Sequence, residues 1–169
     1  MNFGMRMGRR VIALVAVAGA LGVVAGPVQA ATTPPWVGLF RAINKARATH
    51  GLRPMAPSQR LRIAALQHSH DMLCRGYFAH TSPTGSTLTY RVMHSGFITY
   101  GQWWAGETLA WGSGGYGTPD AVVQAWLHSP EHRAILLSPR YHLVGIGRSY
   151  GTFLGHPGAA VWTVDWGHR

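Results

Sequence analysis

Residues 143–150 have the sequence Leu-Val-Gly-Ile-Gly-Arg-Ser-Tyr, and residues 160–166 have the sequence Ala-Val-Trp-Thr-Val-Asp-Trp. Together these segments are rich in valine, isoleucine, tryptophan and threonine, side chains typical of strands, and a glycine-containing stretch separates them. We therefore predict two neighbouring antiparallel strands near the end of the chain. Earlier in the chain the apolar residues recur at helical spacing, so the sequence predicts an α+β sandwich.

Five earlier segments are expected to be helical, each with apolar residues at helical spacing or a helix-start signal. They are residues 39–46, 61–73, 87–94, 118–127 and 131–137. Ser86 is expected to be the N-cap of the third helix, and Thr118-Pro119-Asp120 is a strong start signal for the fourth. The loops at 96–105 and 112–118 are expected to shape any cleft, with 112–117 as a flexible surface loop.

The first thirty residues have the layout of a secretory signal peptide. Three arginines precede an apolar stretch over 11–26, and a small-residue triplet ends at Ala30. We expect cleavage after Ala30, a short linker over 31–36 and one domain over 37–169, with Arg9-Arg10 leaving twin-arginine export open. A retained membrane anchor is the alternative, but this stretch at about 1.5 Å per residue falls short of a hydrocarbon core about 30 Å thick.

The charge balance is strongly positive. The 169 residues contain 15 Lys or Arg against 5 Asp or Glu, and twelve basic residues remain after residue 30. These residues are scattered rather than clustered, and an exported protein does not meet genomic DNA, so we expect no nucleic-acid partner. A basic secreted domain is instead expected near anionic cell-envelope polymers or lipid headgroups.

The single cysteine, Cys74, cannot form an intramolecular disulfide, so the core must hold this domain together. We expect Cys74 to be a small buried hydrophobic residue, with a reactive thiol as the open alternative. Among other polar residues, Asn44 and Arg47 are expected to anchor the loop that follows the first helix. His68 and His70 are two residues apart on a helix and so point to different faces, which argues against a metal pair.

Four short motifs occur along the chain. They are Phe-Ala-His-Thr-Ser-Pro at 78–83, Gly-Glu-Thr-Leu-Ala-Trp-Gly at 106–112, Ala-Trp-Leu-His-Ser-Pro-Glu-His-Arg at 125–133 and Val-Gly-Ile-Gly at 144–147. In combination and order they resemble the CAP (SCP-like) domains of bacterial secreted proteins. The resemblance implies a three-layer α-β-α sandwich with a central antiparallel sheet flanked by helices, and an open cleft lined by histidines and acids.

The resemblance also assigns cleft residues. His80 matches the first cleft histidine, Glu107 the acid and His132 the second histidine. Thr108 stands where the family usually has asparagine, which is one departure from the pattern. Independently, a partly buried Glu107 needs hydrogen-bond donors or a cation to offset its desolvation, and imidazoles are expected to supply them.

A second departure is Ser129, which stands where larger eukaryotic relatives have a glutamate. Glu131 could substitute for that acid. However, consecutive side chains on a helix diverge by about 100°, so Glu131 and His132 are not expected to face one small site together. The alternative role of Glu131 is to favour the start of the short helix after Pro130.

Three chemistries are open for this cleft. Two neutral imidazoles, His80 and His132, with Glu107 as the supporting acid could bind zinc with an open coordination position, and resemblance to zinc-binding members of the family agrees. The same residues could instead form a purely structural hydrogen-bonded cluster. The second chemistry is hydrolysis, in which a histidine would activate water, Ser82 or Ser129. However, no Gly-x-Ser-x-Gly elbow is present.

The third chemistry is binding of a small molecule or lipid, as the resemblance to ligand-binding members implies. The ligand-binding candidates are His80, Glu107, Ser129, Glu131 and His132, and the aromatic residues that could line a groove are Trp103, Trp104, Trp111 and Tyr116. We therefore predict a secreted, monomeric binding module that needs no cofactor, with zinc as its one candidate ion. A hydrolase that uses the same cleft is the alternative.

Overall fold

The computed structural model describes residues 33–98 and 101–169. The expected signal peptide, with its cleavage after Ala30, lies outside these residues. Helix α1 begins at Pro35, so the last two residues of the expected linker are helical, because proline suits the first turn of a helix. Residues 33–169 form one compact unit that contains every hydrophobic cluster described below, so this part of the chain carries its own core.

Within the described residues, helices dominate the first half and strands the second. The elements are α1 (Pro35–Thr49), β1 (Ala56–Pro57), α2 (Gln59–Arg75), α3 (Leu88–His94), β2 (Trp104–Ser113), the 3-10 turn η1 (Gly114–Gly117), α4 (Pro119–Leu127), α5 (Pro130–Leu136), β3 (Leu143–Phe153) and β4 (His156–His168). The strands form one sheet in the order β1-β3-β4-β2. All its pairings are antiparallel except the short parallel contact of β1 with β3.

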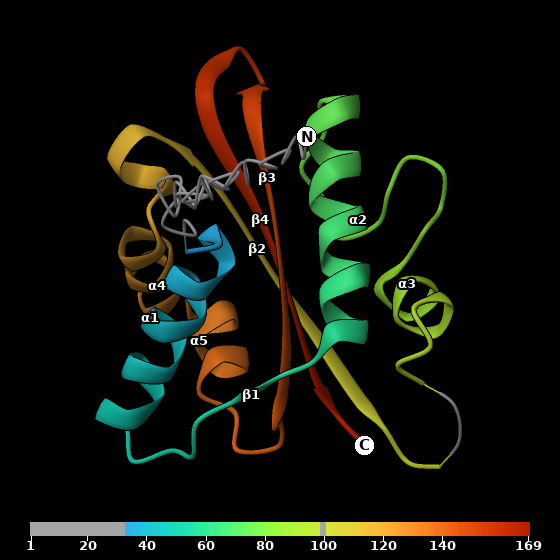
Figure 1. Ribbon diagram of the computed structural model, residues 1–169, viewed down its shortest axis with the longest axis vertical. Helices are drawn as coiled ribbons and strands as arrows, with labels where there is room; N and C mark the ends of the chain where they lie inside the picture. Colours follow the sequence, from blue (N-terminus) through green and yellow to red (C-terminus); the bar gives the residue numbers. More distant parts are fainter. Residues whose placement is uncertain (1–32, 99–100) are drawn as a thin grey trace, which may run out of the picture. The chain divides into compact units, whose positions relative to one another are not determined.

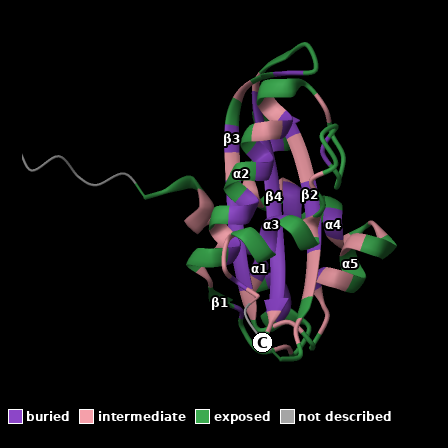
Figure 2. Cartoon of the chain, turned by 90° about the vertical axis from the view of Figure 1, so that its right-hand side faces the viewer, coloured by how far each residue is buried: buried purple, intermediate pink, exposed green. Residues whose placement is uncertain are grey.

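Helices cover both faces of this sheet, which confirms the predicted three-layer sandwich. In Figure 1, α1, α4 and α5 lie on one side of the strands, and α2 and α3 lie on the other. β4 is central and is buried along most of its length (Figure 2). Side chains of a strand alternate between faces. Trp162, Val164 and Trp166 accordingly pack in the cluster with α1 and α4, whereas Val161 packs with Met72 of α2.

The Val-Gly-Ile-Gly motif brings α2 directly against β3. A Cβ on Gly145 would overlap the backbone of Leu61 and Arg62, and one on Gly147 would overlap the backbone of Ala65. The intervening Val144 and Ile146 point to the opposite face and join its core. Glycine therefore appears at every second position because only a bare backbone lets the helix approach this closely.

The predicted pair of late strands is confirmed, and each runs longer than predicted. β2 was not predicted. Residues 104–105 and 112–113 of this strand belong to the loops expected at 96–105 and 112–118. The prediction of a flexible loop at 112–117 is also wrong. Gly112 and Gly117 are buried, residues 114–117 form η1, and the Gly117 carbonyl accepts a 3.0 Å hydrogen bond from Trp162 Nε1.

Two further local predictions are wrong. Cys74 is exposed rather than buried, because it lies off the buried stripe of α2, with its Sγ 3.5 Å from Nε2 of the neighbouring His70. The N-cap of α3 is Thr87 rather than Ser86; its hydroxyl accepts the Tyr90 amide at 3.2 Å.

The expected anchors of the loop after α1 are confirmed. Asn44 accepts from the Met55 amide at 2.8 Å and donates to its carbonyl at 3.3 Å. Arg47 is buried and donates to the carbonyls of Arg53, Leu136 and Ser138. These bonds tie α1 to both the following loop and the end of α5. Among the described residues, no helix has the length and hydropathy needed to cross a membrane.

Candidate functional site

Glu107 is placed by β2, which is an edge strand of the sheet. The next residue, Thr108, points to the opposite face, where its hydroxyl accepts a 3.1 Å hydrogen bond from Trp166 Nε1. Thr108 therefore takes part in the core at the position where the family pattern has asparagine. Glu107 faces α2 and α3 and is only 5% exposed, so its charge must be compensated within the fold.

Three cationic or imidazole groups surround the Glu107 carboxylate. His80 Nδ1 donates to Oε1 at 2.7 Å, Arg91 Nη2 donates to Oε2 at 2.6 Å, and His68 Nε2 lies 4.0 Å from Oε1. Burial alone would raise the pKa of Glu107, but the His80 hydrogen bond and the Arg91 charge outweigh it and hold the pKa below its ordinary value. Glu107 is therefore an anion around which the site is organised.

His80 lies in the loop after α2, and its side chain is 59% exposed. The hydrogen bond to Glu107 raises the pKa of His80, against the opposing effect of partial burial. Arg91 fixes the same loop, since it also donates to the carbonyls of His80 at 3.1 Å and Ser86 at 2.8 Å. Because Nδ1 is held by Glu107, Nε2 is the ring nitrogen left without a hydrogen bond to the described residues.

His132 approaches from α5, which contacts β2 on the other face of the sheet. Its Nδ1 is hydrogen-bonded to Ser129 Oγ at 2.7 Å, and Nε2 has no hydrogen bond to the described residues. Burial lowers the pKa of His132, and the charge of His80 lowers it further. His80, bonded to Glu107, and His132, on α5, thus approach the edge strand β2 from opposite faces of the sheet.

Glu131 is exposed in the first turn of α5 and makes no capping hydrogen bond. Its charge nevertheless raises the pKa of both His80 and His132. Glu131 therefore borders the same site without joining the hydrogen-bonded network, and the residue that bonds directly to His132 is Ser129.

Three buried members of the network were not identified from the sequence: His68, Arg91 and Asp165. His68 and His70 do point to different faces, as expected, but His68 is buried beside Glu107 and bonds to the Ala79 carbonyl at 3.0 Å. Burial lowers the pKa of His68, which favours the neutral imidazole. Only the scarcity of acids in the chain could have drawn attention to Asp165.

Asp165 lies directly opposite Glu107 in the antiparallel pairing of β2 with β4. It is fully buried, and neither of its carboxyl oxygens has a hydrogen-bond donor among the described residues. Burial raises the pKa of Asp165 well above its ordinary value, and the negative charge of Glu107 adds to the shift. The shift favours the protonated, neutral form of Asp165 beside the Glu107 anion, whose charge Arg91 balances.

The described residues contain no group of three or more His, Cys, Asp or Glu side chains arranged to hold a metal ion. His80 and His132 offer one free Nε2 each, so further ligands would have to come from outside this set. The predicted aromatic groove is also not assembled. Trp104 stacks on Arg140 at 5.3 Å, Trp111 packs on Phe153 at 5.4 Å, and Tyr116 is 84% exposed.

The α-β-α fold and the polar cluster around Glu107 define the class of protein. Residues 40–166 match the family model described as the cysteine-rich secretory protein family, CAP. The chain belongs to that family.

Two relatives are proteins of Bacillus subtilis. The uncharacterized protein YkwD is 36% identical over 104 residues, which cover 62% of this chain and 38% of YkwD. The uncharacterized membrane protein YlbC is 37% identical over 111 residues, covering 64% of this chain and 30% of YlbC. The chain thus spans well under half the length of these curated relatives.

Solved structures share the fold. An extracellular protein containing an SCP domain from Bacillus anthracis is 29% identical, with a TM-score of 0.60, over 78% of this chain and 39% of that one. An outer surface protein from Borrelia burgdorferi is 23% identical, with a TM-score of 0.62, over 78% of this chain and 90% of that one. The Borrelia likeness concerns the fold alone.

Proposed function

We propose that this protein is a secreted, monomeric binding module that holds a ligand between the imidazoles of His80 and His132. The observation that carries the proposal is the state of the two rings. Each Nδ1 is held by a neighbour, Glu107 or Ser129, while each Nε2 has no hydrogen bond to the described residues. Each ring is therefore held in place through one nitrogen, and its other nitrogen is free to bind a ligand from outside the fold.

Zinc is the ion that these donors fit best. Histidines that bind zinc typically donate their other ring nitrogen to a carboxylate, as His80 does to Glu107, and this contact fixes the orientation of the ring. Two imidazoles are fewer ligands than a structural zinc site uses, so the remaining positions would be filled by solvent or by the bound molecule. Zinc binding would also require both rings to be neutral, and it should therefore weaken as the pH falls.

Secretion and an envelope partner are part of the same proposal. One structural relative, 29% identical, is described as an extracellular protein, and the first thirty residues have the pattern of a signal peptide. The excess of basic residues favours small anionic molecules, lipids or anionic cell-envelope polymers as partners over nucleic acid. No resident cofactor is required for binding of this kind.

Calorimetric titration of zinc into residues 33–169 tests the metal-binding part. We expect saturable binding that is lost in the His80→Ala/His132→Ala double variant. His128→Ala is the matched control, because His128 is exposed and its ring bonds only within α4, and this variant should bind like the wild type. Absence of binding in the wild type would overturn the zinc assignment and direct the search to lipids and envelope polymers.

A serine hydrolase is the second candidate, and one observation favours it. Ser129 Oγ lies 2.7 Å from His132 Nδ1, the separation that an activated serine needs. However, no acid bonds to the other nitrogen of His132, so the pair lacks the third group that orients the base in a triad. A fluorophosphonate probe should leave Ser129 unlabelled if the protein is a binding module, and labelling of Ser129 would favour the hydrolase.

A further inference from the structure

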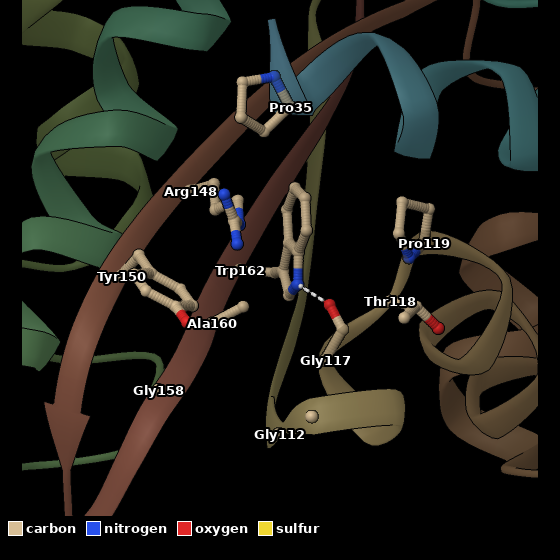
Figure 3. A pocket seen from close by; sticks show the side chains of 11 residues that line it. Pro35, Gly112, Gly117, Thr118, Pro119, Arg148, Tyr150, Gly158, Ala160 and Trp162 are labelled. Atoms are coloured by element: carbon tan, nitrogen blue, oxygen red, sulfur yellow. Dashed lines mark hydrogen bonds between the residues drawn. The ribbon is translucent and has the colours of Figure 1, made fainter.

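A hollow of about 380 Å³ lies on the face of the sheet opposite Glu107, where β3 and β4 meet the first turns of α1 and α4 (Figure 3). Its walls are the starts of these two helices, the glycines around η1 and the two strands. The side chains that matter below are Pro35, Pro119, Arg148, Tyr150 and Trp162. His80, Glu107 and His132 do not line it, so the hollow is separate from the site described above and does not depend on the proposed function.

Among the described residues, Arg148 is the one charged residue that lines the hollow. Its guanidinium carbon lies 4.9 Å from the ring centre of Tyr150 and 5.3 Å from that of Trp162, so two aromatic rings hold the group. Arginine remains protonated at all ordinary pH values. Among the described residues, no carboxylate forms an ion pair with Arg148.

The Nε atom of Arg148 is buried and has no hydrogen-bond partner within residues 33–98 and 101–169. A buried donor without an acceptor costs free energy, more so when it is charged. Neighbouring polar groups do not meet this need, because the Trp162 indole is itself a donor and is already bonded to the Gly117 carbonyl. The hollow is therefore lined by a fixed cation that has no anionic partner among the described residues.

The rest of the lining indicates what kind of anion would fit. Apart from Arg148 the walls are mainly proline, glycine, alanine and aromatic surface, with the Thr118 hydroxyl at the start of α4. That hydroxyl is occupied, since it donates to the Gly115 carbonyl and accepts the Ala121 amide. Phosphate sites usually gather several donors around one group, whereas this hollow offers a single planar fork. One guanidinium matches one carboxylate.

We propose that this hollow binds a small organic carboxylate of sugar-acid size. The carboxylate accepts the terminal N–H groups of Arg148, and the body of the ligand packs between Pro35, Pro119 and the Tyr150 ring. The volume lies at the lower end of the range of about 300–1,000 Å³ for small-molecule sites. A free sugar acid and the terminal residue of an acidic envelope glycan share this chemistry, so both are included in the test.

The test is NMR titration of residues 33–169 with sodium glucuronate at constant ionic strength, observing the Arg148 Nε–H and the Trp162 indole N–H. Glucose is the neutral counterpart, and a trisaccharide with a terminal glucuronate represents the glycan. We expect saturable shifts of both signals with glucuronate or the trisaccharide and none with glucose. Binding of the trisaccharide alone would support the site and assign its source to the glycan.

Two variants separate the charge from the fold. Arg148→Gln should weaken glucuronate binding at least about tenfold, which is the loss expected for one charge-assisted hydrogen bond. Arg140→Gln is the matched control, because Arg140 also stacks on an aromatic ring, that of Trp104, but lies outside the hollow. The Trp162 indole signal shows whether the fold is intact. If Arg148→Gln does not fold, glucuronate binding is measured instead in Arg148→Lys, which keeps the charge.

The proposal would be overturned by no saturable shift with either acid, by equal shifts with glucose, or by unchanged affinity in Arg148→Gln. Tighter binding of inorganic phosphate than of glucuronate would also overturn it, because it would make the hollow a phosphate site.

Discussion

Replacing Arg91 with methionine should strongly destabilise this domain. Arg91 and Glu107 are 5% and 2% exposed in their side chains, and Nη2 lies 2.6 Å from Oε2. Breaking a buried ion pair by removing one partner leaves an uncompensated charge, which costs about 3–5 kcal/mol. Arg91→Met also removes the bonds to the carbonyls of His80 and Ser86, so we place the loss toward the upper end of that range.

The assay is urea unfolding of residues 33–169, followed by tryptophan fluorescence, with thermal unfolding alongside. At about 3–4 °C per kcal/mol for a domain of this size, Tm should fall by about 10–20 °C. Arg75→Met is the matched control: Arg75 also pairs with an acid at 2.7 Å, but its side chain is 53% exposed, so its loss should cost less than about 1 kcal/mol. A loss below about 1 kcal/mol in Arg91→Met would refute the view that Arg91 balances the buried acids.

Three further predictions concern neighbouring features. Asp165→Asn should change the free energy of unfolding by less than about 1 kcal/mol, because burial and the charge of Glu107 both favour the neutral form of Asp165; a loss above about 3 kcal/mol would mean that the carboxylate is charged. The raised pKa of His80 should stabilise the fold below its ordinary value of 6.5, and this contribution should disappear as the pH rises through the folded pKa. Comparing wild type with His80→Gln across that window isolates the effect, and parallel pH profiles would contradict it. Gly145→Ala should cost about 1–3 kcal/mol because a Cβ would strike the α2 backbone, whereas Gly151→Ala, with 3.4 Å of room, should cost less, and equal losses would contradict the close packing.

Much of the fold follows from local patterns. The helical stripes and cap signals predict the helices to within a few residues, and strand-forming residues identify β3 and β4. β2 was missed because glycine, alanine and glutamate lower its local strand propensity, and it becomes a strand by pairing with β4 some fifty residues later. Cys74 illustrates another limit: cysteine generally prefers burial, but this position lies off the apolar stripe of α2 and is exposed.

The site likewise has one part that the sequence predicts and another part that it does not. The motifs single out His80, Glu107 and His132; His80 bonds to Glu107, and His132 lies on α5, which contacts the same edge strand. Arg91 and Asp165 could not be predicted, because their roles depend on strand register and helix packing. Asp165 meets Glu107 only through the pairing of β2 with β4, and nothing local specifies which residues lie opposite each other.

An NMR titration of the histidine side chains in residues 33–169 tests directly whether His80, Glu107 and His132 form one site. The network predicts that His80, whose Nδ1–H donates to Glu107, titrates above the ordinary pKa of histidine. It also predicts that His132 titrates below that ordinary pKa. The two curves should move toward each other in Glu107→Gln, because His80 then loses its carboxylate partner. If both rings instead titrate together near their ordinary value in the wild type, the two histidines are independent surface groups and the proposed binding site does not exist.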